Sequence, residues 1–190
     1  AAPQTALLIV LSYRFDQPFE EPWRDYEHCV RIELRELSAS DSTALVESAI
    51  HGSIPQGLQT LIDKAQGNPF FIEEVMRELI ETGALVQTDN GWQLTEGLDE
   101  TTIPGSIEGI ITARLDRLEE QYREVIQVAS VIGRRFQYPI LSDMVPSGDL
   151  ISRLNWLTAS DLIVPDMNEL AYLFKHALTR DVTYESILYA

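Results

Sequence analysis

The sequence is poor in basic residues. It has 14 Lys and Arg against 30 Asp and Glu in 190 residues, which gives a net charge of −16. The excess of acidic residues is unevenly distributed. Residues 1–103 contain 6 Lys and Arg and 18 Asp and Glu, whereas residues 104–190 contain 8 Lys and Arg and 12 Asp and Glu. Binding to nucleic-acid phosphates needs several cations at once, and the negative electrostatic field of this chain repels phosphate groups. We therefore do not expect a nucleic-acid partner.

Cysteine and histidine are also scarce. Cys29 is alone, which excludes an intramolecular disulfide and favours a cytoplasmic location. The three histidines, at positions 28, 51 and 176, do not form the paired spacing of zinc ligands with Cys29, so we predict no metal site.

Long apolar runs and catalytic groupings are missing as well. No run approaches the roughly 18 apolar residues that cross a bilayer, so we expect no membrane partner. No Ser-His-Asp arrangement occurs, and adjacent acids such as Glu73–Glu74 are typical of solvated helix surfaces. We therefore predict no catalytic residue. The chain begins without Met, and we interpret it as a piece of a longer protein.

Two strands are predicted near the start of the chain. The continuous apolar run 6–11 is typical of a buried strand in a parallel sheet, and the alternating residues 29–34 predict a second strand. Arg14 follows the first run, at the strand edge where open α/β sheets meet their ligands. From its position alone, the favoured interpretation of Arg14 is a surface residue that begins a loop.

Helical patterns and a hairpin occupy the next segment. We predict helices over 38–50, 57–66 and 69–82, and a hairpin over 84–95 around an Asn-Gly turn. Gly67, Asn68 and Pro69 suit a helix-to-helix corner, because Gly can take a left-handed conformation, Asn can cap a helix and Pro fits a first turn.

A second set of elements follows a linker at 101–104. Apolar spacing predicts helices over 107–118, 119–132 and 149–159, then a hairpin over 162–174 and a closing helix over 176–189. Three helices followed by a hairpin predict a winged helix.

Six short motifs also occur in order along almost the whole chain. They are Ser12-Tyr13-Arg14, Leu34 to Asp41, Gly67 to Glu74, Ile103-Pro104 with Ala113 to Leu118, Ala129 to Phe136, and Phe174 to Leu178. Each is unspecific alone, but the ordered set resembles the AAA-type module of STAND ATPases, the signal-transduction branch of the P-loop NTPases. The resemblance is to bacterial regulators in which this module is linked to class III nucleotide cyclase or LuxR-type DNA-binding domains.

The resemblance implies a mixed, mainly α fold in three parts. Residues 1–37 would end the parallel α/β sheet of the NTPase core, residues 38–102 would form a helical lid subdomain with the hairpin, and residues 103–190 would form a winged-helix domain. ATP or ADP with Mg²⁺ would be the cofactor of the intact protein.

The resemblance also implies three nucleotide-contacting residues. Arg14 matches the sensor 1 arginine that meets the terminal phosphate, a role that suits a permanently charged, forked guanidinium. Pro69 matches the sensor 2 proline, which packs against adenine or ribose. His176 matches the winged-helix histidine that reaches the ADP β-phosphate and holds such switches closed. A structural role for His176 remains an alternative, and Lys175 could also serve a phosphate.

The phosphate-binding half of such a module is missing from the sequence. There is no Gly-x-x-x-x-Gly-Lys-[Ser/Thr] loop, and the apolar run 6–11 ends in Ser-Tyr-Arg rather than in acids. We therefore expect this chain to be the C-terminal part of a nucleotide switch, without enzymatic activity or tightly bound nucleotide of its own. Its partners would be the upstream NTPase half and effector domains of the longer protein.

Two other interpretations of the sequence remain. A winged helix often binds DNA through a helix in the major groove, but the candidate helix 149–159 carries only Arg153 as a cation. A protein-interaction scaffold would suit the acidic first half.

The charge generates a first prediction. The chain should show no specific binding to duplex DNA at physiological salt, because too few cations face the phosphates. An electrophoretic mobility assay over a salt series measures this. A salt-sensitive shift with a defined sequence would favour the DNA-binding interpretation instead.

Overall fold

The computed structural model describes residues 7–13, 20–23, 26–55, 57–95, 104–145, 148–167 and 169–187. Helices dominate these residues, and two small antiparallel sheets accompany them. The chain divides into two units, residues 1–35 and residues 36–190. The predicted mixed, mainly helical character is therefore confirmed.

The first unit corrects the two predicted strands. Residues 7–13 and 29–34 have no regular secondary structure, and Leu7 to Leu11 are 55 to 85% exposed. A strand is stable only when its N–H and C=O groups pair with a neighbouring strand. The described residues of this unit form turn hydrogen bonds, such as Cys29 N–H to the Tyr26 carbonyl at 2.9 Å, but no ladder.

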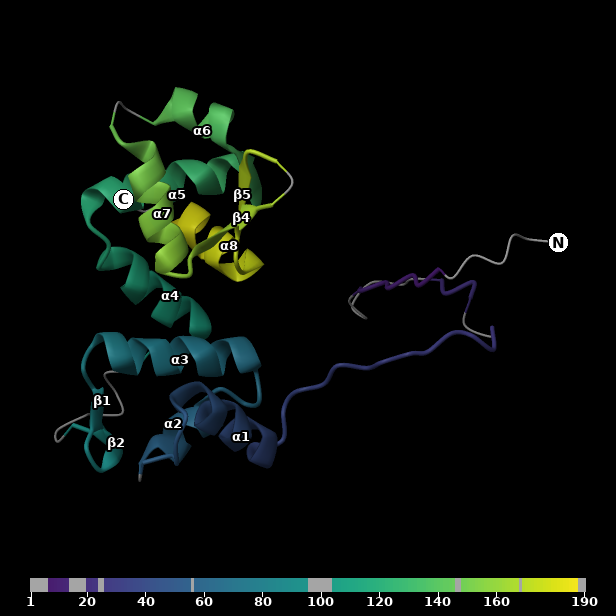
Figure 1. Ribbon diagram of the computed structural model, residues 1–190, viewed down its shortest axis with the longest axis vertical. Helices are drawn as coiled ribbons and strands as arrows, with labels where there is room; N and C mark the ends of the chain where they lie inside the picture. Colours follow the sequence, from purple (N-terminus) through teal and green to yellow (C-terminus); the bar gives the residue numbers. More distant parts are fainter. Residues whose placement is uncertain are drawn as a thin grey trace. The chain divides into compact units, whose positions relative to one another are not determined.

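The second unit opens with three helices, which we call the lid segment together with the hairpin that follows (residues 36–95). The helices are α1 (Ala39–Ile50), α2 (Leu58–Lys64) and α3 (Pro69–Glu81), drawn in blue in Figure 1. The Ser38 hydroxyl caps α1 by accepting from the Asp41 N–H at 3.2 Å. All three predicted helices are confirmed, because their caps and apolar spacing are local signals.

The corner before α3 is closely packed. Gly67 has φ +74°, and a Cβ at this residue would lie 2.3 Å from the Leu37 carbonyl oxygen. The Leu37 N–H donates to the Gly67 carbonyl at 2.8 Å. Asn68 then caps α3, because its Oδ1 accepts from the N–H groups of Phe70 at 3.0 Å and Phe71 at 3.3 Å. Only glycine fits this close approach of two backbones.

The hairpin packs against the end of α1. Strands β1 (Leu85–Thr88) and β2 (Gly91–Leu94) pair antiparallel, with Asp89 and Asn90 in the turn. The Trp92 indole N–H donates to the Ile50 carbonyl at 2.8 Å, which holds the hairpin against the last turn of α1.

Residues 104–187, which we call the C-terminal segment, alternate helices and strands. The elements are α4 (Ile107–Asp116), α5 (Glu120–Ile132), β3 (Arg135–Gln137), α6 (Tyr138–Met144), α7 (Leu150–Ala159), β4 (Ile163–Asp166), β5 (Ala171–Phe174) and α8 (Ala177–Ile187). The three strands form an antiparallel sheet in the order β3-β5-β4. The sequence did not predict β3 or α6, which are only three and seven residues long.

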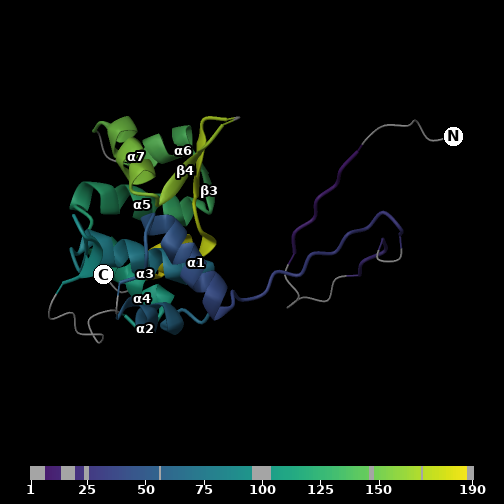
Figure 2. The ribbon, with the colours of Figure 1, turned by 60° about the horizontal axis from the view of Figure 1, so that its bottom comes forward.

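One hydrophobic core runs through both segments of the second unit. Helices α3 and α4 lie beside each other in both views of the ribbon (Figures 1 and 2) and are in contact. Ile110 and Ile111 of α4 are each 1% exposed. None of the helices in the described ranges has the length and apolar content that a membrane crossing demands.

The Gly67 corner generates a second prediction. Gly67→Ala should lower the free energy of unfolding by about 2 to 5 kcal/mol, because left-handed strain of about 1 to 2 kcal/mol adds to a backbone clash. Chemical denaturation measures this loss.

Gly83→Ala is the matched control. Gly83 has φ +70°, but a Cβ there meets nothing within 4 Å. It should therefore lose only the strain, about 1 to 2 kcal/mol. Equal losses in the two variants would contradict the close approach at Gly67.

Candidate functional site

The structure brings two of the three predicted site residues to one place. Pro69 is the first residue of α3, and His176 lies between β5 and α8. The His176 ring stacks on Phe70, which follows Pro69, with ring centroids 3.7 Å apart and an angle of 20° between the planes. Arg14, the third predicted residue, lies outside the described residues. The start of α3 and the residues between β5 and α8 are thus in contact.

The environment of His176 favours its neutral form. Burial lowers the pKa of this imidazole, and the adjacent Lys175 lowers it further, although the acids Glu74, Glu73 and Asp161 act in the opposite direction. A histidine with a lowered pKa is uncharged near pH 7, so one ring nitrogen donates and the other accepts. Its protonation below the ordinary pKa of about 6.5 therefore works against the folded state.

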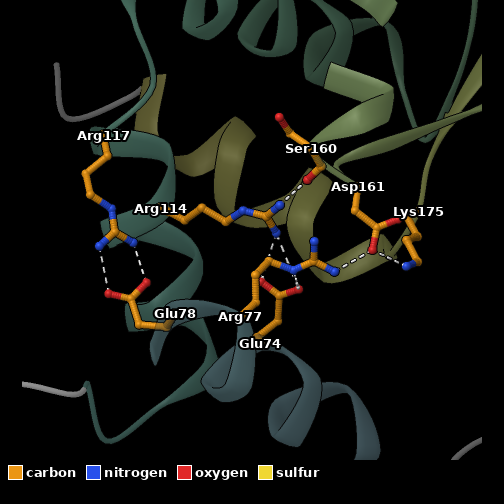
Figure 3. A network of polar contacts seen from close by, with 8 residues as sticks. All are labelled: Glu74, Arg77, Glu78, Arg114, Arg117, Ser160, Asp161 and Lys175. Carbon is orange, nitrogen blue, oxygen red and sulfur yellow. Dashed lines mark hydrogen bonds and ion pairs between the residues drawn. The ribbon is translucent and has the colours of Figure 1, made fainter. Parts of the chain in front are cut away.

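A polar cluster lies next to this site, where α3 meets the C-terminal segment (Figure 3). We call it the junction cluster, and its members are Glu74, Arg77, Arg114, Asp161 and Lys175. Three cations thus face two acids, and they come from α3, from α4, from the turn after α7 and from the end of β5.

Glu74 and Arg114 form the buried part of the junction cluster. They are 4% and 7% exposed, and Arg114 donates to the two Glu74 carboxylate oxygens at 3.0 and 3.4 Å. Arg114 also donates to the carbonyl of Ser160, in the turn that joins α7 to β4. One guanidinium therefore connects three elements.

The expectation that Glu74 is a solvated surface acid is wrong. Glu74 lies between Phe71 and Val75, which are also buried, so it falls within the apolar face of α3. Arg114 likewise lies on the apolar face of α4, beside the buried Ile110 and Ile111. The helical spacing of the sequence could have indicated this burial. It places Glu74 and Arg114 on the apolar faces of two helices, and an acid and a base in such positions indicate a buried ion pair.

Asp161 forms the more exposed part of the junction cluster. Its carboxylate accepts from Arg77 and from Lys175, and its backbone has φ +62°. Burial alone would raise the pKa of Asp161, but the hydrogen bonds from Lys175 and Arg77 outweigh it and hold this pKa below its usual value. The stabilisation is therefore present at neutral pH and is lost as the pH falls through the depressed pKa.

A hollow of about 520 Å³ lies between α1 and α3. Its lining is mostly apolar, and it also includes Arg77 and Lys175 of the junction cluster and the acids Glu73 and Glu81. Within the described ranges, no group of three or more His, Cys, Asp or Glu side chains is arranged to hold a metal ion. The site can therefore offer ring faces and one imidazole hydrogen bond.

Comparison with known proteins gives one distant similarity. The chain is 24% identical over 145 residues to the hybrid signal transduction histidine kinase G of Dictyostelium discoideum. The match covers 72% of this chain but 4% of that protein. No family model matches the chain, and no solved structure matches it.

The buried pair generates a third prediction. Glu74→Ala should lower the free energy of unfolding by about 3 to 5 kcal/mol, because it leaves the Arg114 charge buried without its carboxylate. Urea denaturation at neutral pH measures the loss.

Arg117→Ala is the matched control. Arg117 makes a two-pronged pair with Glu78, one contact at 2.7 Å, but its own side chain is 43% exposed. The Glu78 side chain is 11% exposed, so the loss should exceed the roughly 1 kcal/mol or less that is typical of a surface pair, at about 1 to 2 kcal/mol, and stay below the loss at the buried pair. A similar loss in both variants would contradict the special role of burial.

Proposed function

We propose that this chain is the C-terminal part of an ATP/ADP-dependent signalling switch of the STAND type. In this proposal the lid and C-terminal segments sense the bound nucleotide and pass its state to effector domains. The observation that carries the proposal is the contact between Phe70 and His176 at 3.7 Å. It brings His176 against the residue that follows Pro69 in the sequence, and this contact supports the proposal that Pro69 and His176 meet one ligand.

The layout of the C-terminal segment supports the same proposal. A helix, a strand, two helices and two strands follow one another from α5 to β5, and the sheet order is β3-β5-β4. In this proposal the segment is a winged helix, with β4 and β5 as the wing. His176 then follows the wing directly, which is the place the resemblance implies.

The chemistry of the site suits an adenine nucleotide. The Pro69 ring has no N–H, so it can pack against adenine or ribose without offering a competing donor. The neutral His176 imidazole can donate one hydrogen bond to a phosphate oxygen, and Arg14 would meet the terminal phosphate. The bound nucleotide would supply the phosphate charge that distinguishes the two states of the switch.

Residues outside this chain would hold most of the nucleotide. The phosphate loop and the Mg²⁺ ligands are absent from the sequence, so they would come from an upstream half. A cytoplasmic regulator fits this arrangement, and the distant relative is by its name a signal transduction protein.

The DNA-binding alternative loses support in the structure. Arg153 is the cation of α7, but its side chain is 15% exposed and lies 3.8 Å from Glu124. A recognition helix needs cations that reach outward to phosphates and bases.

The test of the proposal is His176→Ala in a protein that includes the upstream half. Loss of a hydrogen bond to a charged phosphate costs about 1.5 to 3 kcal/mol, so ADP affinity should fall by one to two decades. Basal signalling output should rise, because the variant loses a contact made only in the closed state. Calorimetric ADP titration measures the affinity, an assay of the attached effector domain measures the basal output, and thermal melting measures the stability of the variant.

His28→Ala serves as the control, because His28 is exposed and lies far from His176 in sequence. It should leave ADP affinity and melting unchanged. If His176→Ala lowers the melting temperature while ADP affinity per folded molecule stays the same, the histidine is structural and the proposal fails.

A further inference from the structure

The hollow between α1 and α3 has two apolar walls. These helices lie side by side in both views of the ribbon and are in contact (Figures 1 and 2). The α3 wall consists of Ile72, Met76 and Ile80, and the α1 wall consists of Leu45, Val46 and Ala49. Residues four apart lie on one face of a helix, so the α3 wall is a row about 12 Å long. We call the hollow between the two walls the α1–α3 groove.

The walls of the α1–α3 groove can receive the side chains of a third helix. Ile72 and Met76 are 1% and 4% exposed and form its deep part, whereas Ile80 is 45% exposed and stands at its mouth. Helices pack when the side-chain rows of one enter the groove beside the rows of another. An apolar groove two helical turns long therefore matches one face of an amphipathic helix.

The unpaired charges at the α1–α3 groove are negative. Glu73 and Glu81 belong to its lining and are exposed, and neither forms an ion pair within the described ranges. Arg77 and Lys175 also line the groove, but both are bound to the carboxylate of Asp161. A helix that enters the groove thus meets two acids that can still accept a cation.

The charge of the whole lid segment points the same way. Residues 36–95 contain 9 Asp and Glu and 2 Lys and Arg, a net charge of −7. This charge disfavours nucleic acid and anionic lipid as occupants. It also disfavours a second copy of the chain, whose net charge is −16. Among the helices that the structure describes, none has more than one net positive charge.

We propose that the α1–α3 groove binds a basic amphipathic helix of another protein. Apolar side chains of the partner, spaced i, i+3, i+4 and i+7, enter between the α1 and α3 walls. Lys or Arg residues at the edges of that apolar face meet Glu73 and Glu81. The proposal gives the lid segment a protein partner of defined chemistry, and it does not depend on nucleotide binding.

The test uses a labelled synthetic peptide of about 12 residues, enough to span the groove as a helix. The peptide carries Leu at i, i+3, i+4 and i+7, with Lys and Ala at the other positions. Fluorescence anisotropy should show saturable binding to one site on the 190-residue chain. A peptide with Glu in place of each Lys should not bind. No saturable binding of the basic peptide up to about 1 mM, or equal affinity for both peptides, would overturn the proposal.

An apolar variant locates the binding site. Ile80→Lys should lower the affinity for the basic peptide at least about tenfold, because it removes an apolar anchor and adds a repelling charge. Ile151→Lys is the matched control, since Ile151 is 56% exposed on α7 and is not part of the groove lining. The control should keep the affinity within about twofold. Equal affinity in the two variants would place the peptide elsewhere and overturn the proposal.

A charge variant tests the acids at the groove, and it also decides the question if Ile80→Lys fails to fold in thermal melting. Glu73→Gln with Glu81→Gln should lower the affinity about fivefold or more at low salt, and less at high salt. Glu120→Gln with Glu185→Gln is the control, because it removes the same charge from exposed positions on α5 and α8. An equal loss in both would show that net charge alone attracts the peptide, which contradicts the site.

Two further measurements test the other occupants. Analytical ultracentrifugation of the chain should show a monomer, and a dimer that Ile80→Lys dissociates would show that a second copy fills the groove. Vesicles of phosphatidylcholine and phosphatidylserine should not co-sediment with the chain. Vesicle binding that Ile80→Lys abolishes would make the groove a membrane contact. Either result would overturn the assignment of the groove to a basic helix.

Discussion

The burial of Arg114 is the constraint on which the second unit of this protein depends. A guanidinium keeps its charge at every physiological pH and carries five donors, so it must find acceptors wherever the fold buries it. Glu74 provides a carboxylate from α3, and Ser160 provides a carbonyl from the turn after α7. These acceptors belong to elements that are distant in the sequence. The position of a single side chain therefore sets the relation between the lid segment and the C-terminal segment.

The electrostatics of His176 follow from the same junction. Lys175 precedes it and forms an ion pair with Asp161, which also accepts from Arg77. Lys175 contributes to the lowered pKa of His176, and the acids of the junction limit that effect. A change in the charge of Lys175 or Asp161 would therefore alter the pKa of the imidazole that stacks on Phe70. The ion pairs of the junction cluster and the pKa of His176 are thus coupled, a few residues from Pro69.

The parts of the fold that sequence predicts are those with local causes. Helices α1 and α3 begin at Ser38 and Asn68, whose side chains cap them, and helix patterns continue from there. Strand β3 escaped prediction because its three residues are held by pairing with β5, where Phe136 faces Tyr172. The run 6–11 has the composition of a buried strand, yet composition cannot supply the neighbouring strand. Pro69 and His176 were singled out by resemblance, whereas their proximity through Phe70 and the burial of Glu74 are tertiary facts.

The residue at position 161 must satisfy two structural conditions, and few of the twenty amino acids satisfy both. Its backbone is left-handed, at φ +62°, a conformation that Gly, Asn and Asp adopt most readily. Its side chain must also bring a carboxylate to Arg77 and Lys175. Asparagine would keep the turn and lose the charge, and glutamate would keep the charge and strain the turn. Aspartate therefore meets both requirements at position 161, whereas asparagine and glutamate each meet only one of them.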